Sequence, residues 1–333
     1  MSIIRTITAA ALALAAGTAG AETLRFSSFE PPVAHITKNI LTPWAEEVSA
    51  ASNGTIDIQM FAGGTLGRSP AQQLKLVEDG VADFAWIIPG YSPGRFTQGT
   101  VAELPFMVPN ATVGSEAMWK MVEDGYFTGD YDKFKLIGVL VSAPNFIVSR
   151  IPIVEPEDMK GINFRGPGPV MLKAVEALGA VPVGGITGPT IADAIRRGLV
   201  EGTMTQWAAV ETFRIGEVTD YYMTAPLGAT PMLVLMNKAK YDSLPDEAKA
   251  AIDKFSGAAF SERFGKSFDA HHDAAGDREA ATGATIVKPD AALTQRWKDA
   301  TQVAVDDWIA TTENGQAIYD AFRERLDAAA AAH

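Results

Sequence analysis

The sequence predicts an α/β protein with two lobes and a cleft between them. Segments with the pattern of strands alternate with helical patterns over residues 24–88, and the same succession returns over residues 134–206. Strands and helices that alternate in this way are typical of lobes built on largely parallel sheets. The chain has 333 residues, which is enough for two lobes of ordinary domain size.

The first run of elements opens with an alternating segment rich in strand formers at residues 24–28. Apolar residues then recur at steps of four over residues 36–48, which predicts a helix that stops at Asn53 and Gly54. The same two patterns predict a strand over residues 55–61, a helix over 70–78 closed by Gly80, and a buried strand over 82–88.

The second run holds shorter strands. We expect strands over residues 135–141, 146–149, 162–165, 181–183 and 199–206, with helices over 169–178 and 191–197. A further buried strand follows at residues 232–236, and from residue 245 to the C-terminus the pattern is mostly helical.

The N-terminal residues have the features of a secretory signal peptide. Residues 1–21 combine one positive charge at Arg5, a short run rich in Ala and Leu, and the small-residue ending Ala19-Gly20-Ala21. The apolar run is too short and too rich in Ala to span a hydrocarbon core of about 30 Å. We therefore expect cleavage after Ala21 and a soluble mature chain, from Glu22, in the periplasm.

Composition argues against several classes of function. The formal net charge of −12 argues against nucleic acid as a partner. The absence of cysteine removes disulfides, thiolate metal sites and cysteine nucleophiles. The four histidines include no H-E-x-x-H spacing. We expect no metal and no other cofactor.

Several segments match, in order and in spacing, the motifs of one family. The segment DMKGINFR at residues 158–165 resembles the "DLKGLKIR" segment of the DctP-type extracytoplasmic receptors of tripartite ATP-independent periplasmic (TRAP) transporters. The resemblance extends over most of the mature chain, from about residue 24 to residue 254. Other matching segments are FAGGTLG at 61–67, QLKLVEDGVADF at 73–84, LPF at 104–106 and MNK at 236–238.

The resemblance implies a fold and a mode of action. Two discontinuous α/β lobes, residues 22–142 with 229–270 and residues 143–228 with 271–333, are joined by crossing strands and a long helix that spans both. A small organic carboxylate binds in the cleft, which closes by a hinge motion. The receptor is not an enzyme and delivers its solute to the membrane subunits of a TRAP transporter; we expect a monomer.

Arg165 is the first candidate for a ligand contact. The resemblance assigns it the role of a clamp on the ligand carboxylate, for which the guanidinium fork is well suited. Independently, Arg165 ends a short apolar strand and precedes Gly166-Pro167-Gly168-Pro169. Such carboxyl ends of strands are where α/β folds bind ligands. The alternative is a surface Arg paired with an acidic neighbour.

Other candidates follow from positions at which sialic-acid receptors of the family place ligand groups. Those receptors have an Asn where this chain has Phe29, a carboxylate near Ile88, and an Asn where this chain has Thr205. A second family Arg falls near Ala143, where this chain has none. The full set of expected ligand contacts is Arg165 with Phe29, Glu30, Trp86, Ile88, Tyr91, Asn145, Phe146, Thr205, Gln206 and Trp207.

The aromatic residues in this set suggest the kind of solute. A site with one Arg and several aromatic walls lacks the polar groups to hold a polyhydroxylated sugar acid, and unmatched buried hydroxyls would cost a few kcal/mol. Such a site suits an aromatic or apolar monocarboxylate. The aromatic walls are Phe29, Trp86, Tyr91, Phe146 and Trp207, at least two of which we expect in ordinary core.

Two alternatives stay open. The first is the same kind of receptor for a C4-dicarboxylate, a 2-oxo acid or a sugar acid, although a dicarboxylate normally requires a second cation, from Arg150, Arg95 or Lys173. A secreted hydrolase is the rival from another class, but Gly-x-Ser-x-Gly does not occur. The charged helical stretch at residues 269–272 is interpreted as a solvated face.

Overall fold

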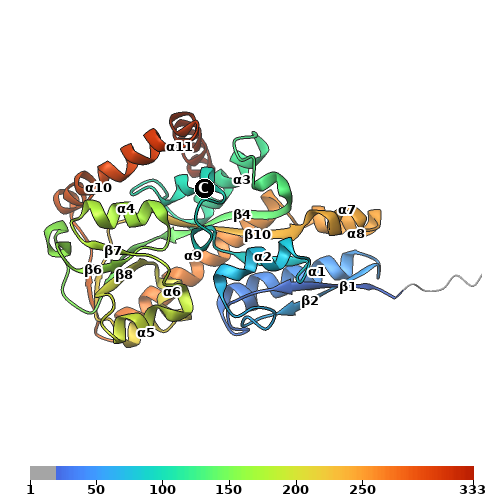
Figure 1. Cartoon of the computed structure of the whole chain (residues 1–333), viewed down its shortest axis with the longest axis horizontal. Coiled ribbons are helices and arrows are strands. Elements are labelled where there is room, and N and C mark those ends of the chain that lie inside the picture. The colour runs from blue at the N-terminus through green and yellow to red at the C-terminus, as the bar shows by residue number, and fades with distance from the viewer. Residues whose placement is uncertain (1–19) are drawn as a thin grey trace, which may run out of the picture.

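The computed structural model describes residues 20–333, which form two α/β lobes (Figure 1). The fold class predicted from the sequence is confirmed. Residues 1–19 of the expected signal peptide lie outside the described part of the chain. The first strand, β1, begins at Glu22, the residue at which we expect the mature chain to start.

The first lobe is built on a five-stranded sheet in the order β2-β1-β3-β10-β4. The first three of these strands are parallel, whereas β10 is antiparallel to β3 and to β4 because it brings the chain back from the second lobe. The strands are β1 (Glu22–Ser27), β2 (Ile56–Phe61), β3 (Phe84–Ile87), β4 (Phe134–Pro144) and β10 (Ala229–Asn237). Its helices are α1 (Thr42–Ala51), α2 (Gln73–Glu78), α3 (Ala111–Glu123), α7 (Lys238–Ser243) and α8 (Asp246–Lys254).

The second lobe carries a six-stranded sheet in the order β11-β9-β5-β8-β6-β7. It is also mixed, because β5 is antiparallel to β8 and β9 while β6 is parallel to β7 and β8. Its strands are β5 (Phe146–Ser149), β6 (Asn163–Arg165), β7 (Val181–Val183), β8 (Gly202–Thr205), β9 (Tyr221–Met223) and β11 (Thr285–Val287). Its helices are α4 (Pro169–Ala177), α5 (Ile191–Arg196) and α6 (Trp207–Thr212).

The two lobes are joined by extended chain and by one long helix. β4 passes into β5 with Asn145 alone between them, and residues 224–228 lead from β9 back to β10. The helix α9 (Ala258–Ala280) runs along both lobes (Figure 1). Its Phe264 belongs to the core of the first lobe and its Ala275 to that of the second. The crossing strands and this helix hold the lobes face to face.

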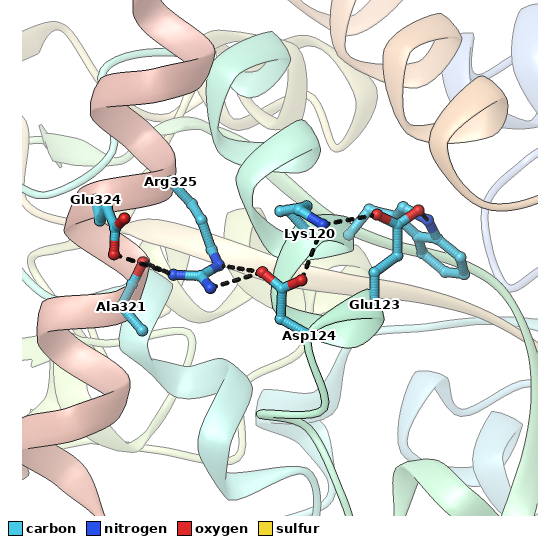
Figure 2. A network of polar contacts seen from close by, with 7 residues as sticks. Lys120, Glu123, Asp124, Ala321, Glu324 and Arg325 are labelled. Carbon is cyan, nitrogen blue, oxygen red and sulfur yellow. Dashed lines mark hydrogen bonds and ion pairs between the residues drawn. The ribbon is translucent and has the colours of Figure 1, made fainter.

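The C-terminal helices form a further connection. α10 (Ala291–Thr311) packs on α4 of the second lobe, whereas α11 (Gly315–Ala332) packs on α3 of the first. Arg325 of α11 donates hydrogen bonds of 2.9 and 2.6 Å to Asp124, which also pairs with Lys120 (Figure 2). We expected residues 271–333 to belong to the second lobe. The final helix lies on the first lobe because its apolar side joins that core through Ile318, Phe322 and Leu326.

We find no helix among residues 20–333 with the length and apolar character needed to cross a membrane.

Candidate functional site

A small cavity of about 50 Å³ lies between the lobes. Its first wall comes from the loop after β1, from the chain after β3 and from β10 and α9, and its second wall from β6, β8 and α6. The apolar side chains that line it include Phe29, Ile88, Ile191, Phe213, Met232 and Phe268. Arg165 is the only Arg or Lys among the lining residues of the described chain.

Arg165 ends β6, which lies between β8 and the edge strand β7 of the second sheet, and its side chain lines the cavity. Its side chain is almost wholly buried, with 2% of the residue exposed. Nε donates to the carbonyl of Ile186 at 3.0 Å, and Nη1 lies 3.3 Å from both Thr203 Oγ1 and the carbonyl of Met204. Nη2 donates to the Tyr91 hydroxyl at 3.4 Å. All four of these acceptors are neutral.

The charge of Arg165 is therefore uncompensated by a direct partner. No carboxylate in residues 20–333 lies within ion-pair distance of its guanidinium. Burial lowers the pKa of Arg165, but a guanidinium stays protonated at neutral pH. A buried charge costs several kcal/mol unless it is paired. The site is thus built to receive an anion.

Tyr91 connects the two lobes across the cleft. Its hydroxyl accepts hydrogen bonds from Arg165 and, at 2.9 Å, from the backbone N–H of Gly188. The adjacent Gly90 touches the second lobe so closely that a Cβ would lie 2.6 Å from the carbonyl oxygen of Pro167. These contacts place the structure in a closed conformation, in which the cavity is enclosed by both lobes.

Glu103 is a second connection between the lobes. It ends the 3₁₀ segment Thr97–Glu103 of the first lobe, and its carboxylate accepts a 3.0 Å hydrogen bond from the N–H of Val170 in the first turn of α4. Burial raises the pKa of Glu103 to about 8, against the backbone hydrogen bonds at Val170 and Met171 and the charge of Arg165 beyond ion-pair distance, which lower it. A Cβ at Gly168 would overlap the carboxylate, at 2.1 Å. Sequence reasoning missed Glu103, although the match at residues 104–106 adjoins it.

Glu30 brings a carboxyl group to the cavity wall. Only 5% of the residue is exposed. Oε1 accepts from the indole N–H of Trp86 at 3.4 Å, while Oε2 is buried and has no hydrogen-bond partner within the described chain. Burial raises the pKa of Glu30 to about 7.

The structure brings together most of the residues that the sequence suggested for the site. Seven line the cavity: Phe29, Glu30, Ile88, Tyr91, Arg165, Thr205 and Gln206. Gln206 also caps α6, because its Oε1 accepts from the N–H of Ala209 at 3.0 Å.

The other four lie behind the lining. Trp86 is part of the first core and reaches the site only through Glu30. Asn145 bonds to the carbonyl of Gly228 and to Thr230 where the chain crosses between lobes. The rings of Phe146 and Trp207 pack in the second core with 4.5 Å between centroids and an interplanar angle of 52°.

Two histidines at the cavity wall were not among the predicted site residues. His35 and His271 stack at 4.0 Å between ring centroids, and His271 Nε2 lies 3.3 Å from Glu211. Burial lowers the pKa of His35 to about 4 and also lowers that of His271, so both rings are neutral at pH 7.

The interpretation of residues 269–272 as a solvated face was wrong. His271 lines the cavity, and Asp269 accepts hydrogen bonds from the N–H groups of Ala111 and Thr112 at the start of α3, both at 2.8 Å. A charged stretch on a long helix looks solvated in sequence when its partners are distant in the chain. Among the described residues, His, Cys, Asp and Glu side chains nowhere gather in threes that could hold a metal ion.

Comparison with known proteins adds independent findings. The model of the family described as "Bacterial extracellular solute-binding protein, family 7" (DctP) matches residues 26–312. The ectoine/5-hydroxyectoine-binding periplasmic protein of Ruegeria pomeroyi is 25% identical over 263 residues, which cover 76% of this chain and 75% of that protein.

Two solved structures share the arrangement of both lobes. A marine metagenome TRAP solute-binding protein specific for aromatic acid ligands, from an unidentified microbe and in complex with 3-hydroxybenzoate, is 32% identical, with a TM-score of 0.88 over 92% of this chain and 98% of that one. A TRAP solute-binding protein from Rhodoferax ferrireducens, in complex with copurified benzoate, is 29% identical, with a TM-score of 0.88 over 93% and 99% of the two chains.

Proposed function

This chain belongs to the bacterial extracellular solute-binding proteins of family 7, the DctP family, and is a TRAP solute-binding receptor; from that premise we propose that its solute is a small aromatic monocarboxylate. The carboxylate binds to Arg165 and the ring lies between the apolar walls of the cleft. The observation that carries this proposal is the buried guanidinium, which has only neutral partners.

The charge of the cavity supports one carboxylate rather than two. Among residues 20–333, Arg165 is the single permanent cation in the lining, and the neutral His35 and His271 add no positive charge at pH 7. Arg150, considered as a second cation for a dicarboxylate, instead pairs with Glu201 at 2.6 Å outside the cavity. A dicarboxylate would leave one charge without a partner.

The size and the walls of the cavity support a single ring. A volume of about 50 Å³ holds roughly four waters, or ~120 Å³ of liquid volume, which suits a small monocyclic acid. Aromatic and aliphatic side chains surround the cavity, as they do in most small-ligand pockets. The benzoate and 3-hydroxybenzoate in the two similar structures agree with this size and chemistry.

We also propose the compartment and the state in which the receptor works. A signal peptide is cleaved after Ala21, so that the mature chain starts with β1, and the receptor works in the periplasm as a monomer. It hands its solute, chemically unchanged, to the membrane subunits of its transporter. Incubation with the solute, followed by recovery of the intact acid, tests the absence of turnover.

The clamp is tested by titrating the mature chain with benzoate in a calorimeter. Lys in place of Arg165 keeps the charge but loses the fork of donors, so we expect Arg165→Lys to weaken benzoate binding by about 10-fold or more. Arg150→Lys is the matched control, since Arg150 belongs to a surface ion pair, and its affinity should stay within about twofold of wild type.

The same titration, repeated with C4-dicarboxylates, 2-oxo acids and sugar acids, distinguishes the alternative solutes. If only C4-dicarboxylates, 2-oxo acids or sugar acids bind, the receptor function stands and the aromatic solute is wrong. Equal affinities of Arg165→Lys and wild type would contradict the clamp.

A further inference from the structure

The carboxyl group of Glu30 is a buried polar group that the binding of a carboxylate at Arg165 leaves unused. Glu30 lies in the loop after β1 and lines the cavity, yet its Oε2 has no hydrogen-bond partner in residues 20–333. A buried polar atom without a partner costs about 1–3 kcal/mol. Such a group in a native cleft calls for a ligand atom to satisfy it.

The position of this carboxyl group is fixed from behind. Its Oε1 accepts from Trp86, whose indole is wholly buried and lies 5.9 Å from the ring of Phe264. The backbone of Glu30 is held at both ends, because its N–H donates to Ser28 Oγ at 3.3 Å and its carbonyl accepts from Gly63 at 2.7 Å. A polar group held in this way is preorganised for a ligand.

Glu30 and Arg165 belong to opposite walls of the same cavity. Arg165 extends from β6 of the second lobe, while Glu30 follows β1 of the first. Neither a hydrogen bond nor an ion pair joins the two side chains. A solute whose carboxylate is held by Arg165 therefore presents its other end to the first lobe.

We propose that Glu30 is a specificity-determining residue, which binds a hydroxyl group on the ring of the solute. This inference rests on the proposed function and makes the solute a hydroxylated aromatic acid. A phenolic O–H donates to the ionised carboxylate, and such a charge-assisted hydrogen bond is stronger than a neutral one. A second carboxylate at the same place would meet a like charge, so Glu30 also excludes dicarboxylates.

The protonation of Glu30 sets the conditions for a test. Because burial raises the pKa of Glu30 to about 7, the group is mostly ionised at pH 8 and then only accepts hydrogen bonds. At that pH a methoxy group, which has no proton to donate, cannot replace the hydroxyl.

The test is calorimetric titration at pH 8 with benzoate, 3-hydroxybenzoate, 4-hydroxybenzoate and 3-methoxybenzoate. We expect at least one hydroxybenzoate to bind wild type about 10-fold or more tightly than benzoate, the equivalent of about 1.4 kcal/mol. In Glu30→Ala this preference should fall to about twofold or less, with benzoate still bound. Glu30→Gln keeps the size of the side chain but removes its negative charge, so it should also lose most of the preference for the hydroxybenzoate. It replaces Glu30→Ala in the test if the Ala variant does not fold.

Glu211→Ala is the matched control. Glu211 pairs with Arg278 at 2.7 Å and lies 3.3 Å from His271 at the edge of the site, but it does not line the cavity, so its removal changes the local charge by the same amount. It should alter the affinities for all four acids alike and keep the hydroxyl preference.

Two outcomes would overturn the inference separately from the function. Wild type that binds benzoate and both hydroxybenzoates equally, or a preference that persists in both Glu30 variants, rejects the hydroxyl subsite and leaves the aromatic receptor intact. No binding of any aromatic acid to wild type rejects the proposed solute, and the inference with it.

Discussion

A few side chains set the chemistry of the cleft, and each of them is held by groups outside the cavity. Arg165 is oriented by two carbonyls and by Thr203, and Glu30 is oriented by Trp86. These two side chains therefore lose little conformational entropy when a solute binds, because neighbouring elements have already fixed their orientation. In the proposed binding mode, specificity at this scale comes from Arg165 and the ionised Glu30, which lie on opposite walls of an apolar cavity.

Tyr91 offers a test of contacts that exist only when the lobes are closed. We expect Tyr91→Phe to weaken binding of the aromatic acid by about 3- to 10-fold, because it leaves the N–H of Gly188 without its acceptor and removes one partner of Arg165 in the closed state. Calorimetric titration measures the change. The free energy of unfolding should change much less, and a variant with wild-type affinity would show that the bridge does not contribute to closure.

The sequence could not separate the residues that line the cavity from those that pack behind them. Arg165 stood out because the resemblance at residues 158–165 assigns it the clamp, with which the short strand and the loop of Gly and Pro agree; the pattern alone fits a surface Arg equally well. Trp207 and Phe146 share the same neighbourhood in sequence, yet their rings fill the second core. An aromatic side chain serves a core or a pocket equally well, and the choice depends on which face of the strand turns to the cleft.

At the scale of elements, α9 is the helix on which both lobes depend. It contributes aromatic rings to one core, closely approaches Trp207 at Gly276, and caps α3 through Asp269. A Cβ at Gly276 would lie 2.9 Å from the indole ring, so glycine is needed there. These contacts join segments far apart in sequence, and the periodicity of a charged helix gives no sign of them.

The cap on α3 can be measured directly. Asp269 accepts from two N–H groups and, at 2.6 Å, from the hydroxyl of Thr112. We expect Asp269→Ala to lower the free energy of unfolding by about 2–3 kcal/mol, as followed by urea denaturation. Asp273→Ala, at an exposed position on the same helix, should change it by about 0.5 kcal/mol or less. Equal losses in the two variants would mean that the cap adds nothing.

At the scale of the molecule, the alternation of strands and helices was enough to predict the fold class. It was not enough to assign the last helix to a lobe. The apolar periodicity of α11 does not say which core it joins, and only the tertiary packing of Ile318, Phe322 and Leu326 places it against α3. The order of crossings between lobes was available only through resemblance, since periodicity does not say which strands pair.

The stability of the whole protein should depend on pH through its buried histidines. Burial lowers the pKa of His272 to about 4, whereas a histidine in the unfolded chain takes up its proton near pH 6.5. Between these values the unfolded state binds more protons, so the free energy of unfolding falls as the pH falls. His272→Gln removes this proton uptake. When the pH is lowered from 7 to 5, we therefore expect the free energy of unfolding of this variant to fall by about 1–2 kcal/mol less than that of wild type.

Urea denaturation at the two pH values measures this difference. His333→Gln, at the C-terminus, is the control; its ring contacts only the partly exposed Glu116, so the variant should follow wild type to within about 0.5 kcal/mol. Parallel losses in wild type and His272→Gln would show that this ring does not contribute to the acid sensitivity.

The repeated passage of the chain between the lobes limits how such a protein can change over evolution. Each lobe is assembled from stretches that the other lobe interrupts, and the site takes its Arg from one and its Glu from the other. No single recombination point can therefore exchange one half of the cleft for that of a relative. New solute preferences have to arise by substitutions within an intact frame, with both walls inherited together.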